Sequence, residues 1–253
     1  MTTNLQDGIS LKSFFSDRKG GDRTKTLETL INYVKECNNK PVKFLMLWGA
    51  GDKSKASQAD KDTLLYLIHF LDNVQNIFDK KVKFKIIFTD THIYLNGYNP
   101  NTATGYFSDI IYHLKKQRFS YDFSSNICKE KIRKRGYIDY KKFIDDIVKN
   151  ATQWFDEINI EEQQITNFYK YALKHSDRIG KHSSGIFFNN EIESAKGYLY
   201  FANFEKEIIS EKFKDYMFIT YMSREEEFAL PSLPIVRLYS IKSGLRTRPW
   251  FTQ

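Results

Sequence analysis

The chain has few cysteines and no long apolar run, and both absences limit the class of protein to which it belongs. Its 253 residues include two cysteines, Cys37 and Cys128, which provide neither a metal-binding spacing nor a framework of disulfides. Such sparse use of cysteine fits a reducing cytoplasm. No apolar run approaches the length that spans a membrane, and residues 1–10 lack the apolar core of a signal peptide. We therefore expect a soluble cytoplasmic protein with no membrane partner.

Motifs that hold metals and nucleotide cofactors are missing as well. The histidines show no metal-ligand spacing. The glycine turn at residues 49–54 matches neither GxxxxGK[ST] nor GxGxxG, the two motifs that cradle phosphates. The sequence therefore predicts no metal site and no bound cofactor.

The composition is that of a globular chain without internal divisions. Apolar residues make up 41% of it and aromatic residues 16%, which is enough to bury a sizeable core. No repeat, low-complexity tract or strong linker interrupts it. We expect a polar N-terminal arm over residues 1–23, a single domain over residues 24–253, and a monomer.

The stretch from residue 42 to residue 92 organises the rest. An apolar run at 42–48 is followed by the glycine turn, then by apolar residues at helical spacing, and then by a second apolar run at 84–88. Strand, turn, helix and strand form a βαβ unit, which implies parallel strands. We predict an α/β fold, a Rossmann-like parallel sheet flanked by helices. Ligands bind such sheets beyond the carboxyl ends of the strands.

Two groups of candidate site residues follow from that placement. The turn after the first strand could bind an anion through its backbone amides and lysine side chain, or could be a plain strand-to-helix turn. Its members are Gly49, Gly51, Asp52, Lys53 and Ser54. Asp90 and His92 leave the second strand two residues apart, so they could share a pocket, or Asp90 could only cap and order the loop.

Further elements follow along the chain. Helical patterns occur at residues 24–37, 104–116, 140–155, 161–175 and 191–209, and strand patterns at 216–221 and 234–241. Tyr198 lies on the last of these helices and Tyr221 closes the following strand. If that strand joins the parallel sheet, Tyr221 reaches the same edge as Asp90. Each tyrosine taken alone could equally be aromatic core.

Positive charge is concentrated in residues 115–142. This segment holds ten basic and three acidic residues, and so carries seven of the chain's eight net positive charges, with Tyr121, Phe123, Tyr137 and Tyr140 interleaved. Such a pattern is typical of a surface that binds nucleic-acid phosphates, although a solvated face has the same composition. The candidate RNA-binding residues are Lys115, Lys116, Arg118, Lys131, Arg133, Lys134 and Arg135.

The order of these parts resembles the cyclodipeptide synthases, which use two aminoacyl-tRNAs to make a diketopiperazine. The resembling residues are 86–93 at the exit of the second strand, and the pair Tyr198 and Tyr221. The resemblance implies a fold related to class I aminoacyl-tRNA synthetases, an aminoacyl-tRNA partner, and Asp90, Tyr198 and Tyr221 around the substrate amino group. The family's nucleophilic serine has only Ser54 as a counterpart here, so either Ser54 is acylated or no covalent intermediate forms. The family's helix glutamate is replaced by Ala202, with Asn203 and Glu205 nearby.

A second family, the isocyanide synthases, is similar in other residues. These enzymes convert the amine of an amino acid to an isonitrile with ribulose 5-phosphate. The similar residues are Lys53, Ser54, Asp60, Thr89, Asp90, His92, Ile93 and Tyr94, then residues 236–240 and 248–250. Here Thr91 replaces a glycine of that pattern and Phe251 replaces a histidine. Our main hypothesis is an aminoacyl-tRNA-dependent transferase that makes a cyclodipeptide; an isocyanide synthase and a non-catalytic RNA-binding module are the alternatives.

Overall fold

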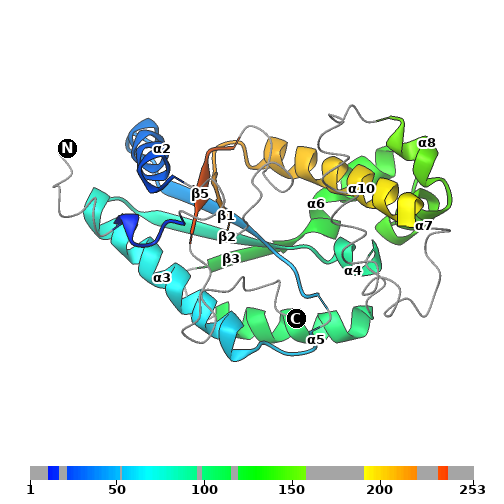
Figure 1. Ribbon diagram of the computed structural model, residues 1–253, viewed down its shortest axis with the longest axis horizontal. Coiled ribbons are helices and arrows are strands. Elements are labelled where there is room, and N and C mark those ends of the chain that lie inside the picture. The colour runs from blue at the N-terminus through cyan, green and yellow to red at the C-terminus, as the bar shows by residue number, and fades with distance from the viewer. Residues whose placement is uncertain are drawn as a thin grey trace.

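The computed structural model describes residues 11–16, 22–51, 53–95, 99–114, 119–157, 191–220 and 233–238. Five parallel strands form one sheet in the order β3-β2-β1-β4-β5, with helices against it (Figure 1). The strands are β1 (Val42–Trp48), β2 (Val82–Phe88), β3 (Phe119–Phe123), β4 (Met217–Thr220) and β5 (Ile235–Arg237). The predicted α/β class with a Rossmann-like parallel sheet is confirmed.

The predicted βαβ unit forms because each of its parts has a strong local signal. β1 is almost entirely buried, as expected for the central strand of a sheet covered on both faces. Helix α3 (Gln58–Phe78) begins with a capping box, in which Ser57 and Asp60 bind each other's backbone amides. It ends at Asp79 in the left-handed conformation, and the chain then enters β2 in register with β1.

The two faces of the sheet are covered by different helices. Phe44, Met46 and Trp48 of β1 pack with α3 and with α5 (Pro100–Leu114) on one face. Leu45 and Leu47 pack on the other face against α6 (Ser124–Lys134) and the carboxyl-terminal half of α10 (Glu191–Lys212). Figure 1 shows α3 and α5 below the sheet and α6 and α10 above it.

A second, smaller core lies among the helices beyond the sheet. It is rich in aromatic residues and joins α6, α7 (Tyr140–Lys149), α8 (Ala151–Phe155) and the amino-terminal half of α10. Phe143, Tyr200 and Phe204 are its centre, with ring centroids 5.1 Å apart for Phe143 and Phe204. Residues 140–155, predicted as one helix, are two helices that part at Asn150.

The first part of the chain also contributes to the main core. Leu11 and Phe15 are fully buried, although they belong to the predicted polar arm, and Phe15 forms a β-bridge with Leu238. Helix α2 (Arg23–Glu36) follows and is capped by the Asp22 side chain. The predicted helix at 161–175 lies outside the described residues, and the domain boundaries stay a prediction.

Three elements were not expected from the sequence, and one of them is α6, since no helix was predicted at residues 124–134. β3 pairs with the edge of β2, and it contains Tyr121 and Phe123, which had been assigned to a phosphate-binding surface. Their rings instead lie against Phe88 of β2, at centroid distances of 5.9 and 5.4 Å. The short helix α4 (Thr91–Leu95) follows β2 where a loop was predicted.

Candidate active site at the carboxyl edge of the sheet

The carboxyl ends of β1, β2 and β3 lie side by side, and each is followed by polar residues. The register pairs Trp48 with Phe88, and Phe88 with Phe123. The glycine turn therefore leaves the sheet next to Asp90, and Asp90 next to Ser124. This is the edge at which parallel sheets bind ligands.

One polar group at this edge, which we call the rim cluster, is centred on Asp90. The Ser124 hydroxyl and the Ser125 backbone amide both donate to its Oδ1, at 3.0 Å each, and the Ser125 hydroxyl donates to Oδ2. Asp90 therefore accepts an amide at the start of α6, where no side chain of the helix itself provides a cap. The rim cluster consists of Asp90, Thr91, His92, Ser124, Ser125 and Glu205.

Glu205 closes the rim cluster from α10. The Thr91 hydroxyl donates to its Oε1 at 2.7 Å, and His92 Nε2 lies 2.6 Å from its Oε2. Thr91 and Ser124 are fully buried, Glu205 is 1% exposed, and the His92 side chain is 19% exposed. A carboxylate so deeply buried requires such partners, because an unpaired charge there would be strongly destabilising.

The two carboxyl groups of the rim cluster are shifted in opposite directions. Burial raises the pKa of Asp90 by more than the hydrogen bonds from Ser125 and Ser124 lower it, and the Glu205 charge adds to the rise. Burial alone would also raise the pKa of Glu205. The charge and hydrogen bond of His92, with hydrogen bonds from Thr91 and Ser124, outweigh it and leave that pKa below its ordinary value. Carboxyl groups with separated pKa values are a common arrangement for acid–base chemistry.

A second polar group, the turn cluster, lies under the glycine turn. Lys53 Nζ and the Tyr106 hydroxyl both reach Asp60 Oδ1, at 2.8 and 3.1 Å, and the Trp48 indole donates to Tyr106 at 2.8 Å. Asp60 is 1% exposed, and Ser57 donates to its other oxygen. The Lys53 ammonium also lies 5.3 Å from the centre of the Tyr106 ring. These residues fix the turn against α3 and α5.

The structure brings the predicted residues together in two groups rather than one. The turn cluster lies on the side of α3 and α5, whereas Glu205 of the rim cluster belongs to α10 on the other face. Ser54 is exposed, and its carbonyl oxygen lies against α5, 3.1 Å from where a Cβ on Gly105 would be. Within the described ranges no contact joins Ser54 to Asp90, which gives no support to a shared nucleophile and base.

Two positions of the turn, residues 49 and 51, favour glycine for different structural reasons. A Cβ on Gly49 would lie 3.3 Å from Thr89 Oγ1, so the absence of a side chain lets β1 and β2 end side by side. Gly51 adopts φ +60°, in the left-handed region that glycine enters at little cost. Both observations account for the turn without a ligand.

Several predicted site residues lie elsewhere than expected, and others lie outside the described residues. Asp90 and His92 do not leave a strand together, because β2 ends at Phe88 and His92 belongs to α4. Asn203 donates to Glu207 at 3.1 Å on α10, away from the rim cluster. Tyr198 lies in α10 but its side chain is not described, and Asp52 and Tyr221 lie outside the described residues.

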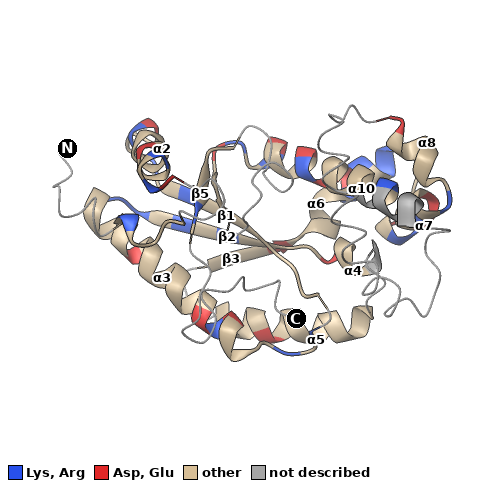
Figure 2. Cartoon of the chain, viewed as in Figure 1, with Lys and Arg blue, Asp and Glu red and all other residues tan. Residues whose placement is uncertain are grey.

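The predicted RNA-binding residues differ from one another in their surroundings. Arg135 is held by an ion pair with Glu157, at 3.2 Å, and lies over the rings of Trp154, Tyr200 and Phe204. Its side chain is still 36% exposed, so Arg135 lies over the small aromatic core and also faces solvent. Figure 2 shows acidic and basic residues mixed over these helices. Lys131, Arg133 and Lys134 are exposed on α6, and Lys115, Lys116 and Arg118 lie outside the described residues.

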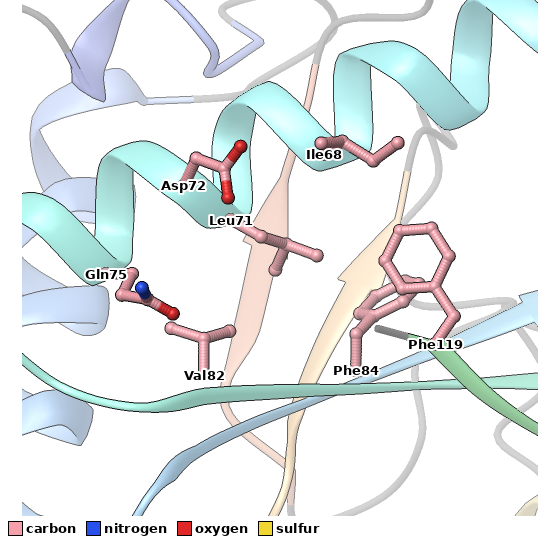
Figure 3. A pocket seen from close by; sticks show the side chains of 7 residues that line it. All are labelled: Ile68, Leu71, Asp72, Gln75, Val82, Phe84 and Phe119. Atoms are coloured by element: carbon pink, nitrogen blue, oxygen red, sulfur yellow. The ribbon is translucent and has the colours of Figure 1, made fainter. Parts of the chain in front are cut away.

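A surface pocket of about 130 Å³ lies at the opposite edge of the sheet (Figure 3). Its walls come from α3 and from the beginnings of β2 and β3, and combine apolar side chains with Asp72 and Gln75 on one side. Its residues are Ile68, Leu71, Asp72, Gln75, Val82, Phe84 and Phe119. Because it is far from the carboxyl ends of the strands, we do not place the active site there.

Sequence reasoning did not identify Thr91, Ser124 and Ser125. The alternation of Phe119, Tyr121 and Phe123 was the available signal for a third strand, and the serines after it would then have fallen at the same edge as Asp90. Among the described residues, no helix has the length and apolar character to cross a membrane. No group of three or more His, Cys, Asp or Glu in that part of the chain is placed to hold a metal ion.

Comparison with solved structures finds this fold in the PvcA protein from Pseudomonas aeruginosa. The TM-score is 0.64 at 9% sequence identity, over 96% of this chain and 87% of the PvcA chain. At such low identity the likeness shows a common fold alone. No protein-family model matches the chain, and no curated protein matches its sequence.

Proposed function

We propose that the chain is an enzyme of the isocyanide synthase type, acting on the amino group of an amino acid. The proposal rests on the positions of the residues that resemble the isocyanide synthases in sequence. Lys53, Asp60, Asp90 and His92 all belong to the turn cluster or the rim cluster, and Arg237 is the last residue of β5 at the same edge. The fold is shared with PvcA, an isocyanide synthase, along nearly the whole chain.

The chemistry of such a reaction suits the rim cluster. An amine that attacks the carbonyl of ribulose 5-phosphate must first lose a proton, and the resulting hydroxyl must gain one to leave as water. A carboxyl group can carry both transfers when its pKa lies closer to neutral than usual. Burial raises the pKa of Asp90 in this direction, and we assign it the acid–base role. Lys53, which pairs with Asp60, and the buried Arg237 are the cations at this edge that we assign to the sugar phosphate.

The tRNA-dependent alternative has less support. No comparison favours cyclodipeptide synthesis. What remains of its nucleic-acid surface among the described residues is the exposed trio Lys131, Arg133 and Lys134 on α6. An exposed trio of cations is common on solvated helices, so it does not by itself indicate tRNA.

The proposal is tested with purified protein, ribulose 5-phosphate and a panel of amino acids, followed by mass spectrometry. We expect one amino acid to yield an isonitrile with the wild type. Asp90→Asn should reduce the product by at least about a hundredfold, the usual contribution of a general acid–base group. Asp72→Asn, at the opposite edge of the sheet, is the matched control and should keep wild-type activity.

Two outcomes would overturn the proposal. One is a wild type that makes no isonitrile from any amino acid of the panel. The other is a diketopiperazine formed when the protein is given aminoacyl-tRNAs, which would restore the tRNA-dependent hypothesis.

A further inference from the structure

The rim cluster contains more hydrogen-bonded contacts than its hydroxyl groups have protons. An unbroken path runs from Asp90 Oδ1 to Ser124 Oγ, at 3.0 Å, then to Thr91 Oγ1, at 2.9 Å, and then to Glu205 Oε1, at 2.7 Å. These are three contacts, but each hydroxyl donates only one proton. If both carboxyl groups are ionised, Ser124 donates to Asp90 and Thr91 to Glu205, and nothing is left to bridge the two hydroxyls.

Because these groups are buried, the absence of a third proton would be destabilising. Thr91 and Ser124 are fully buried and Glu205 is 1% exposed. Two buried oxygens held 2.9 Å apart without a proton between them would repel each other. A third proton, carried by a carboxyl group at either end, lets every contact of the path become a hydrogen bond with one donor.

We propose that Asp90, Ser124, Thr91 and Glu205 hold one shared proton and form a relay between the two carboxyl groups. In the resting arrangement Asp90 is the acid and donates to Ser124, Ser124 donates to Thr91, and Thr91 donates to the Glu205 carboxylate. The Glu205 carboxylate in turn pairs with His92 at 2.6 Å. The relay gives the Asp90 proton a second carboxyl group to occupy, and His92, the partner of that group, is partly exposed.

The transfer itself balances without any further reactant. Asp90 passes its proton to Ser124 Oγ, the Ser124 proton moves to Thr91 Oγ1, and the Thr91 proton moves to Glu205 Oε1. Only O–H bonds break and form, and one proton has moved from Asp90 to Glu205. The transfer leaves Asp90 ionised and ready to accept a proton from a substrate amine.

The groups around the relay favour the proton at the Asp90 end. His92 faces Glu205 from α4 and stabilises its carboxylate, whereas the described contacts of Asp90 are with Ser124 and Ser125 of α6 and include no cation. Cys128 of α6 is the other buried titratable neighbour. Burial, and then the charges of Glu205 and Asp90, raise the pKa of its thiol, with Lys212 of α10 opposing, so Cys128 stays protonated and outside the path.

Infrared spectroscopy tests the relay without any substrate. At neutral pH the wild type should show the carbonyl stretch of one protonated carboxyl group, and Asp90→Asn should abolish this band. Thr91→Val keeps the shape of Thr91 and removes its hydroxyl, so the band should persist at a different frequency. Thr63→Val is the matched control, because Thr63 is also buried but donates to the Ala59 carbonyl on α3.

The wild-type spectrum alone can overturn the proposal. Absence of a protonated carboxyl band at neutral pH means that no third proton is present, and a band that survives Asp90→Asn means that the proton belongs elsewhere. A second variant covers failure of Thr91→Val to fold: Ser124→Ala also interrupts the path, and its protonated carboxyl band should persist at a frequency that differs from that of the wild type.

The catalytic use of the relay rests on the proposed function, whereas its existence does not. If isonitrile formation is observed, Thr91→Val should lower kcat at least about tenfold and leave KM unchanged, since Thr91 passes a proton but does not contact the substrate. A normal kcat would confine the relay to a structural role. A protein that shows the infrared band but forms no isonitrile would refute the proposed function and keep the relay.

Discussion

Replacement of Glu205 by glutamine removes one buried charge and keeps the shape of the side chain. Glu205 accepts from Thr91 at 2.7 Å and pairs with His92 at 2.6 Å. Hydrogen bonds to a charged group contribute about 1.5–3 kcal/mol each, and neutral ones about 0.5–1.5 kcal/mol. Exchanging two of the first kind for two of the second should therefore lower the free energy of unfolding by about 2 kcal/mol. In a chain of 253 residues this corresponds to a decrease in Tm of about 4–8 °C.

The pH dependence of that loss identifies its cause. The pKa of Glu205 is lowered in the folded protein, so its stabilising effect is complete above the unfolded value of about 4.3 and is lost as the pH falls through the folded value. Urea unfolding of the wild type and Glu205→Gln should thus show the full difference at pH 7 and a shrinking one below about pH 4. Glu207→Gln, exposed on the same helix, should match the wild type throughout. A difference that stays constant into acid, or none at pH 7, would show that Glu205 is not ionised in the folded protein.

Two further outcomes follow from the structure. Tyr106→Phe removes the hydroxyl that accepts the hydrogen bond of the buried Trp48 indole, and thermal unfolding should show a loss of stability of about 1–3 kcal/mol. Tyr112→Phe, at a side chain that is 57% exposed, should leave the stability almost unchanged. Equal Tm values for the two variants would contradict this account. An isocyanide synthase has no need of tRNA, so tRNA and an unrelated RNA of the same length should bind equally, with affinities that fall steeply as salt rises. Reversing the charge of Lys131, Arg133 and Lys134 on α6 should weaken the binding of tRNA and of the unrelated RNA to the same extent. A loss of tRNA binding alone would argue for the tRNA-dependent hypothesis.

The parts of the fold that could be predicted have their causes close together in the sequence. β1 is a seven-residue apolar run, and α3 shows apolar residues at helical spacing, so both were identified. β3 was missed because its five residues alternate only briefly and lie inside the most basic segment of the chain. The positive charge of the segment led to its interpretation as an RNA-binding surface, whereas the alternation of its aromatic residues was the pattern that matched the observed strand.

The site was harder to predict because its contacts join distant segments. Asp90 was identified from its place just beyond the end of β2, but its partner Ser125 lies 35 residues away. Glu205 was named only as a neighbour of a missing glutamate, and its partner Thr91 lies 114 residues away. Phe201 and Ile209, four residues before and after Glu205, place it on the buried face of α10, but they do not identify its partner. In the same way, the pairing of Arg135 with Glu157 depends on how α6 and α8 pack, which the charge pattern does not reveal.

Helix α10 belongs to two cores at once, and this determines how firmly the rim cluster is held. The helix has 22 residues, a length of about 33 Å. Tyr200, Phe201 and Phe204 fix the middle of the helix in the small aromatic core, and Ile209, with Phe213 just after the last residue of the helix, fixes its end on the sheet. Glu205 lies at the junction. An opening of the small aromatic core releases the part of the helix that this core holds. The rim cluster therefore stays intact only while both cores stay closed. Amide exchange near Glu205 should follow the fluctuations of α7 and α8 rather than those of the sheet.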